Sequence, residues 1–101
     1  MRLYVVSSCE DTVTGLRLAG IDGTVVSDAK QAEELIERLR QDPGIGIVLI
    51  NRELMKRVDD FVREFRKKNT LPLITEIPDT FSGKGSDSIA RYVREAVGIR
   101  E

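Results

Sequence analysis

Residues 45–50 read Ile-Gly-Ile-Val-Leu-Ile, a run in which only Gly46 interrupts the aliphatic side chains and no residue is polar. A strand buried on both faces has this composition, whereas a strand with one wet face alternates apolar and polar residues. Such strands occur in parallel sheets that helices cover on both sides. The run therefore predicts the central strand of an α/β sheet.

Three other short runs are rich in Val, Ile or Leu and are bounded by polar, Gly or Pro residues. They are Leu3 to Val6, Thr24 to Val26 and Leu73 to Ile77, and we interpret each as a strand. Because a helical segment separates each strand from the next, we expect a four-stranded parallel sheet with right-handed crossovers and helices on both faces, a Rossmann-like or flavodoxin-like three-layer sandwich. The expected order is 2-1-3-4, which places the topological switch point between the first and third strands.

Helices are predicted where apolar residues recur at helical spacing between the strands. The clearest segment places these residues on one face: Leu54, Met55, Val58, Phe61, Val62 and Phe65. The preceding helix is expected to begin at Asp28, with Gln31 at capping-box spacing. A shorter helix over residues 11–19 ends at Gly20, and a last helix is expected at about residues 86–98.

Composition limits the classes of function. The chain has 101 residues, 41% of them apolar, which predicts a single domain over residues 1–101. Sixteen basic and seventeen acidic residues give a net charge of -1, so the overall charge does not indicate a nucleic acid or an anionic membrane as a partner. No apolar run approaches the roughly 18 residues of a membrane span, and the run at Met1 to Val6 is too short for a signal peptide. A lone cysteine, Cys9, without an export signal indicates a cytoplasmic chain.

The sequence contains no histidine, which removes the commonest general base and the commonest metal ligand. One enzymatic alternative is a phosphoacceptor receiver domain, because Glu10 and Asp11 follow the first predicted strand, where such domains hold a divalent cation. Asn51 stands after the third strand, where that class needs an aspartate, and an amide cannot accept a phosphoryl group. Cys9 occupies the place of the nucleophile in phosphocysteine carriers and cysteine phosphatases, but the phosphatase loop needs an Arg where Gly15 stands. We therefore predict neither catalysis nor a cofactor or metal, with phosphotransfer at Cys9, Glu10 and Asp11 as the alternative.

The order of motifs resembles the F subunit of the rotary V/A-type ATPases and ATP synthases. The resemblance rests on Asp11 and Thr12, on the run Gly-Leu-Arg-Leu-Ala-Gly at 15–20, on residues 46–50, on Leu-Pro-Leu-Ile-Thr-Glu-Ile-Pro-Asp at 71–79, and on residues 89–99. The family commonly carries an aromatic residue at the position of Leu16, so the match departs from the pattern there. The resemblance spans nearly the whole chain.

The resemblance implies a non-catalytic rotor subunit of the central stalk. Such a subunit binds the D subunit of the stalk and, through it, is linked to the catalytic A/B hexamer and the membrane rotor, on the cytoplasmic side of the membrane and without inserting into it. The complex couples ATP hydrolysis or synthesis to proton or sodium transport. We expect the partner contact at the end of the last strand and on the last helix, where apolar and Arg side chains gather: Thr75, Glu76, Ile77, Phe81, Arg91, Tyr92, Arg94 and Ile99.

Overall fold

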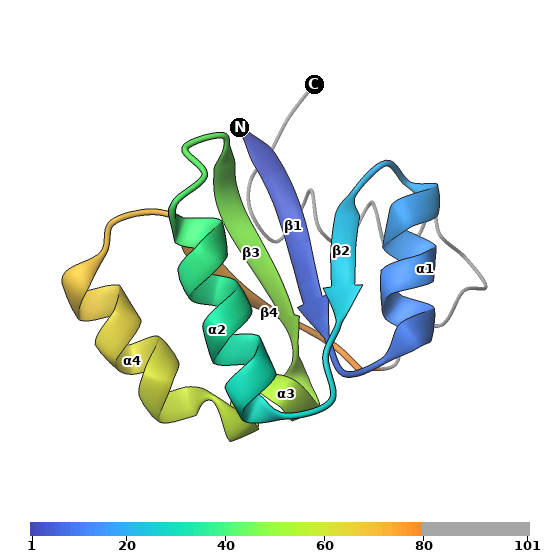
Figure 1. Ribbon diagram of the computed structural model, residues 1–101. Coiled ribbons are helices and arrows are strands. Elements are labelled where there is room, and N and C mark those ends of the chain that lie inside the picture. Colours follow the sequence, from blue (N-terminus) through green and yellow to red (C-terminus); the bar gives the residue numbers. More distant parts are fainter. Residues whose placement is uncertain (80–101) are drawn as a thin grey trace.

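The computed structural model describes residues 1–79, which contain a four-stranded parallel sheet of order β2-β1-β3-β4 (Figure 1). The strands are β1 (Arg2–Ser7), β2 (Asp22–Val25), β3 (Ile45–Asn51) and β4 (Leu73–Ile77). The helices in this range are α1 (Glu10–Leu18), α2 (Ala29–Arg40), α3 (Arg52–Arg57) and α4 (Asp59–Lys68). The predicted fold class and strand order are confirmed, whereas the helix expected at about residues 86–98 lies outside the described residues.

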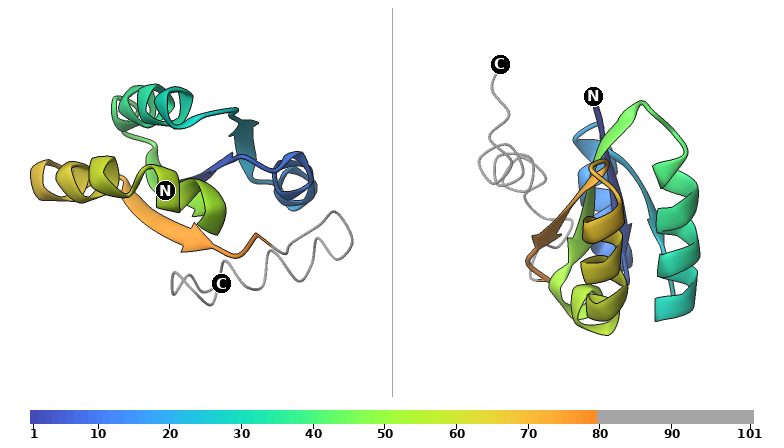
Figure 2. Two further views of the ribbon diagram at one scale, coloured as in Figure 1. Left: turned by 90° about the horizontal axis from the view of Figure 1, so that it is seen from below. Right: turned by 90° about the vertical axis from the view of Figure 1, so that its left-hand side faces the viewer.

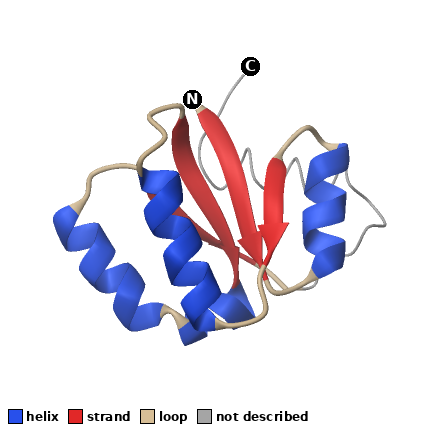
Figure 3. Cartoon of the chain, viewed as in Figure 1, coloured by secondary structure: helices blue, strands red, loops and turns tan. Residues whose placement is uncertain are grey.

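Helices lie on both faces of the sheet, with α2 and α4 on one face and α1 on the other (Figures 2 and 3). Successive side chains of a strand point to opposite faces, so each strand contributes to two apolar clusters. In β1, Val6 packs with the α2 and α4 side and Val5 with the α1 side. Every residue of β3 is buried, and its side chains divide in the same way. The run at residues 45–50 is therefore the centre of the core, as predicted.

Two local signals in the sequence produce the expected helix ends. The backbone N–H of Gln31 donates to Asp28 Oδ1 at 2.8 Å, and Gln31 Oε1 accepts from the backbone N–H of Ser27 at 2.7 Å, which closes a reciprocal cap at the start of α2. Gly20 follows α1 with a φ of 89°, a conformation that costs a residue with a side chain more than it costs glycine. Both ends lie where the sequence predicts them.

The second strand begins two residues before the predicted Thr24, at Asp22. Asp and Gly are uncommon in strands, so propensity alone assigns this pair to a turn. In the structure Gly23 pairs with Val5 of β1, and a side chain at position 23 would place its Cβ 2.8 Å from the Val5 carbonyl oxygen. The close approach of two backbones, which only glycine permits, extends the strand.

The segment predicted as one helix around Leu54 and Phe65 is two helices, because the chain bends at Val58 between α3 and α4. The N–H of Val58 is shared between the carbonyls of Leu54, at 3.1 Å, and Met55, at 3.3 Å, while its own carbonyl still accepts from Val62 at 2.9 Å. The bend turns the chain from the carboxyl end of the sheet, where α3 lies, onto the face that α4 covers (Figure 1). The apolar residues of both helices reach the same cluster despite the bend.

Candidate functional site

Asn51 fills the crevice at the carboxyl ends of β1 and β3, the switch point at which open α/β sheets bind their ligands. The residue is 1% exposed, and its side chain bridges three groups. Its Oδ1 accepts from the backbone N–H of Ser8 at 3.1 Å, and its Nδ2 donates to Ser8 Oγ at 3.0 Å and to Asp79 Oδ1 at 2.8 Å. Both amide hydrogens and the amide oxygen are therefore used within the chain.

Asp79 and Glu53 extend these hydrogen bonds into a network. We call it the Asn51 network, and it consists of Ser8, Asn51, Glu53, Arg57 and Asp79. Asp79 Oδ1 also accepts from the backbone N–H of Glu53 at 2.9 Å, so the carboxylate holds the first turn of α3. The Glu53 carboxylate in turn accepts from Ser8 Oγ at 2.8 Å and from the Arg57 guanidinium. The network ties the ends of β1, β3 and β4 to one another.

The two carboxylates of this network have lowered pKa values. The backbone N–H of Glu53 lowers the pKa of Asp79, and the Asn51 amide lowers it further. The hydrogen bonds from Arg57 and then from Ser8 lower the pKa of Glu53. All of these donors stabilise the ionised form, so both groups are carboxylates at neutral pH and act as hydrogen-bond acceptors.

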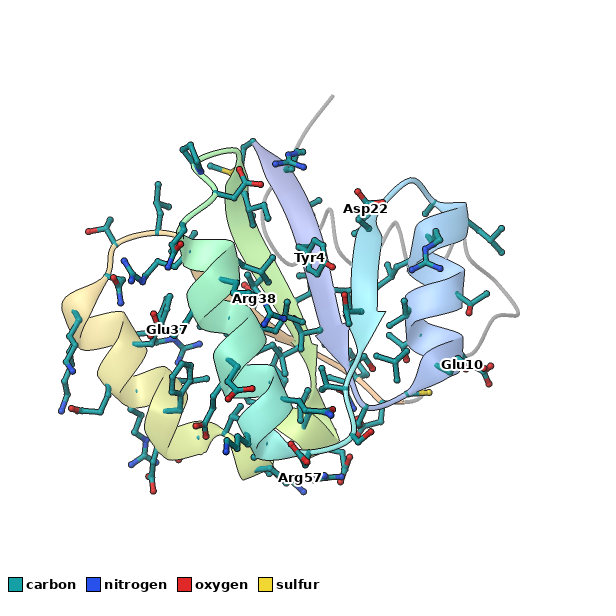
Figure 4. All side chains as sticks on the ribbon, in the orientation of Figure 1. Tyr4, Glu10, Asp22, Glu37, Arg38 and Arg57 are labelled. Carbon is teal, nitrogen blue, oxygen red and sulfur yellow. The ribbon has the colours of Figure 1, made fainter. Side chains whose placement is uncertain are left out.

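The residues of the phosphotransfer alternative lie beside the network but do not form a site. Cys9 precedes α1 and is half-buried, and its backbone N–H donates to Ser7 Oγ at 2.9 Å. Glu10 and Asp11 are exposed in the first turn of α1, and Figure 4 shows Glu10 directed away from the sheet. Position 51, which a receiver domain needs as an acceptor, holds an amide whose groups are already bonded.

Within residues 1–79, no group of three His, Cys, Asp or Glu side chains is arranged to hold a metal ion. In the same range, no helix has both the length and the apolar character needed to cross a membrane. The crevice has neither a free acceptor at position 51 nor a cation-binding cluster among the described residues, so its geometry gives no support to phosphoryl chemistry.

Residues 3–93 match the family described as ATP synthase (F/14-kDa) subunit. The chain belongs to this family. The F subunit of the A-type ATP synthase of Methanothermobacter thermautotrophicus is 34% identical over 92 residues, which are 88% of this chain and 86% of the relative. That of Pyrococcus abyssi is 35% identical over 101 residues, covering 94% and 93%. The F subunit of the V-type ATP synthase of Thermus thermophilus is 28% identical over 87 residues, covering 86% and 84%.

The family membership confirms the resemblance drawn from the sequence. Of the residues expected at a partner contact, three are described, and all lie on β4, which is an edge strand among residues 1–79. Thr75 is half-buried, Glu76 is exposed and pairs with Arg52 at 3.1 Å, and Ile77 is buried in the α1-side cluster. The other five lie outside the described residues: Phe81, Arg91, Tyr92, Arg94 and Ile99.

In this member of the ATP synthase F/14-kDa subunit family, sequence reasoning missed the structural role of three residues at the switch point. It weighed Asn51 only as an unsuitable phosphoacceptor and assigned no role to Ser8 or Asp79. A partial signal was present, because a polar residue ends an otherwise aliphatic strand at a place where parallel strands converge. Which groups that residue would bond could not be read from spacing, since Asp79 lies 28 positions away in the chain.

Proposed function

We propose that this chain is the F subunit of a V/A-type rotary ATPase or ATP synthase, a non-catalytic rotor part of the central stalk. In this role it binds the D subunit of the stalk and is linked through it to the catalytic A/B hexamer and the membrane rotor. It helps to couple ATP hydrolysis or synthesis to proton or sodium transport, on the cytoplasmic side of the membrane. The observation that carries the proposal is the family match over residues 3–93.

The closed crevice supports a binding role over a catalytic one. A small-molecule site needs convergent polar groups that are free to meet the ligand. Here the amide of Asn51 is saturated by Ser8 and Asp79, and the carboxylate of Glu53 is engaged by Ser8 and Arg57. A ligand would have to break these hydrogen bonds before it could form its own.

The rigid body of the domain suits a part that transmits torque. A buried central strand and helices packed on both faces give a close-packed interior with low compressibility. We place the contact with the D subunit at the end of β4, where Thr75 and Glu76 are accessible and Ile77 is buried in the core, together with the residues farther along the chain: Phe81, Arg91, Tyr92, Arg94 and Ile99.

The experiment that tests this function mixes the purified chain with the D subunit of the same organism and reads the product by size-exclusion chromatography with light scattering. A stoichiometric complex is expected. Two separate peaks would contradict the proposal. Charge reversal of Arg91 together with Arg94 is expected to weaken the complex without changing the far-UV circular dichroism spectrum, and an unchanged affinity would remove that surface from the contact.

A further inference from the structure

Among residues 1–79, one edge of β4 carries a surface that neither the Asn51 network nor the core uses. We define the β4-edge surface by Arg66, Lys68, Leu71 and Leu73. Within residues 1–79, β4 has a neighbouring strand on one side only, β3. The last turn of α4, the loop that follows it and the start of β4 enclose a depression of about 440 Å³ at this edge. The depression lies at the opposite edge of the sheet from β2.

Arg66 is held in place at this edge by the backbone. Its Nη2 donates to the carbonyl oxygen of Ile74 in β4 at 2.7 Å, a bond that uses one of the five N–H donors of the guanidinium. The neighbouring cations Arg63 and Lys67 form ion pairs within the helix, with Asp59 and Glu64. Among the described residues, Arg66 and Lys68 have no such ion pair. A fixed guanidinium with spare donors loses little conformational entropy when it binds a carboxylate.

Two leucines near the start of β4 are exposed, and Leu73 lines the depression together with Arg66 and Lys68. Leu71 is 51% exposed and Leu73 is 54% exposed. Leucines exposed singly are ordinary. Here two lie within three positions of each other, and Leu73 shares a depression with two cations that have no ion pair among the described residues. Apolar side chains with Arg nearby are the mixture found in protein contacts. The chemistry that complements this surface is an apolar side chain flanked by carboxylates.

The Arg66 bond also indicates the conformation of the partner. An exposed strand edge can pair with an added strand through its free carbonyl and N–H groups. The guanidinium already occupies the Ile74 carbonyl, so an added strand would have to displace it. A helix binds through side chains instead and leaves this bond intact. An amphipathic helix therefore fits the edge better than an extended segment does.

We infer that the β4-edge surface binds an acidic amphipathic helix of the stalk partner, with leucine-type side chains against Leu71 and Leu73 and carboxylates against Arg66 and Lys68. The inference rests on the proposed function, in which this chain is mounted on the D subunit of the stalk. It adds a second contact on the same edge strand as Thr75 and Glu76, at the strand's other end.

The test measures the affinity of the full chain for the D subunit by isothermal titration calorimetry. The variant Arg66→Glu with Lys68→Glu is compared with the control Lys30→Glu with Arg38→Glu, which makes the same charge change on α2. We expect the β4-edge variant to weaken binding at least about tenfold and to reduce its dependence on salt, while the control stays within about twofold of wild type. A circular dichroism melt of each variant excludes loss of folding as the cause.

Photo-crosslinking gives a second, independent measurement. A benzoylphenylalanine at position 71 is compared with one at Leu18, which is 71% exposed at the end of α1. Figure 1 shows α1 and α4 at opposite sides of the sheet. We expect a crosslink to the D subunit from position 71 and none from position 18. The β4-edge contact would be overturned if the two charge-reversed variants bound the D subunit with equal affinity, or if only position 18 gave a crosslink. In either case the wild-type complex would still form, so the proposed function would stand. Failure of the wild-type chain to bind the D subunit would instead reject the proposed function, and the edge contact with it.

Discussion

Replacing Asn51 by alanine is expected to destabilise the domain strongly, because this side chain is buried and connects three strands. The change removes the acceptor of the Ser8 backbone N–H and two donors, one to Ser8 Oγ and one to the Asp79 carboxylate. A typical hydrogen bond contributes a net 0.5–1.5 kcal/mol, with more for a charged acceptor, so the three bonds together contribute about 3 kcal/mol. That is a large share of a domain stability of about 5–15 kcal/mol.

The substitution Asn51→Asp separates shape from charge. An aspartate keeps the size of the side chain and an oxygen for Ser8, but it places a second carboxylate beside Asp79, where the Asn51 amide now donates at 2.8 Å. Two carboxylates at this distance repel each other unless one binds a proton. We therefore expect Asn51→Asp to destabilise as well at neutral pH, and to recover part of the lost stability as the pH is lowered.

The assay is urea denaturation at neutral pH, followed by far-UV circular dichroism, with thermal melts in parallel. A loss of about 3 kcal/mol corresponds to a fall in Tm on the order of 10–20 °C for a domain of this size. The matched control is Asn69→Ala, since Asn69 is half-buried and its side chain makes one bond, to the Phe65 carbonyl at 3.1 Å. We expect this control to cost about 1 kcal/mol or less. If the two alanine variants lost the same free energy of unfolding, the connecting role of Asn51 would be refuted.

Three other predictions follow from the same geometry. Folding lowers the pKa of Asp79 and that of Glu53. Their contribution to stability is therefore present above the ordinary carboxyl pKa of about 4 and is lost as the pH falls through the folded pKa values. Asp79→Asn should flatten the acid limb of a curve of stability against pH, and an unchanged limb would contradict this. Gly23→Ala should cost about 1–3 kcal/mol in urea unfolding because its Cβ meets the Val5 backbone, so a neutral result would show that β1 and β2 can separate. Cys9→Ser should leave Tm nearly unchanged, and intact-mass analysis after incubation with acetyl phosphate should show no added phosphate on either protein; a phosphate that depends on Cys9 would support phosphotransfer instead.

The sheet could be predicted from the sequence because its decisive signals are local. The aliphatic run at 45–50 identifies a doubly buried strand, and the alternation of strands with helical segments leaves parallel pairing as the remaining arrangement. The caps at Asp28 and Gly20 are also local, since each depends on residues within one helical turn.

The features that could not be predicted depend on contacts between distant segments. Asp22 and Gly23 join a strand because β1 approaches closely enough to exclude a side chain, which propensity does not encode. The bend at Val58 keeps the apolar spacing of a continuous helix, so periodicity could not reveal it. Asp79 reaches Asn51 only after β4 is placed next to β3. In each case tertiary packing determined a structure that the local sequence left open.

Asn51 and Arg66 differ in how many of their hydrogen-bonding groups are free to meet a partner. All buried side-chain nitrogen and oxygen atoms of the described residues have hydrogen-bond partners, and the crevice amide of Asn51 is fully used. A ligand entering there would exchange existing bonds for new ones, and each buried group left unpaired would cost about 1–3 kcal/mol. Arg66 is already oriented by one backbone bond and keeps spare donors at the surface. A partner that supplies a carboxylate to Arg66 displaces only water from the spare donors and breaks no bond within the protein, so binding costs less at the edge of β4 than in the crevice.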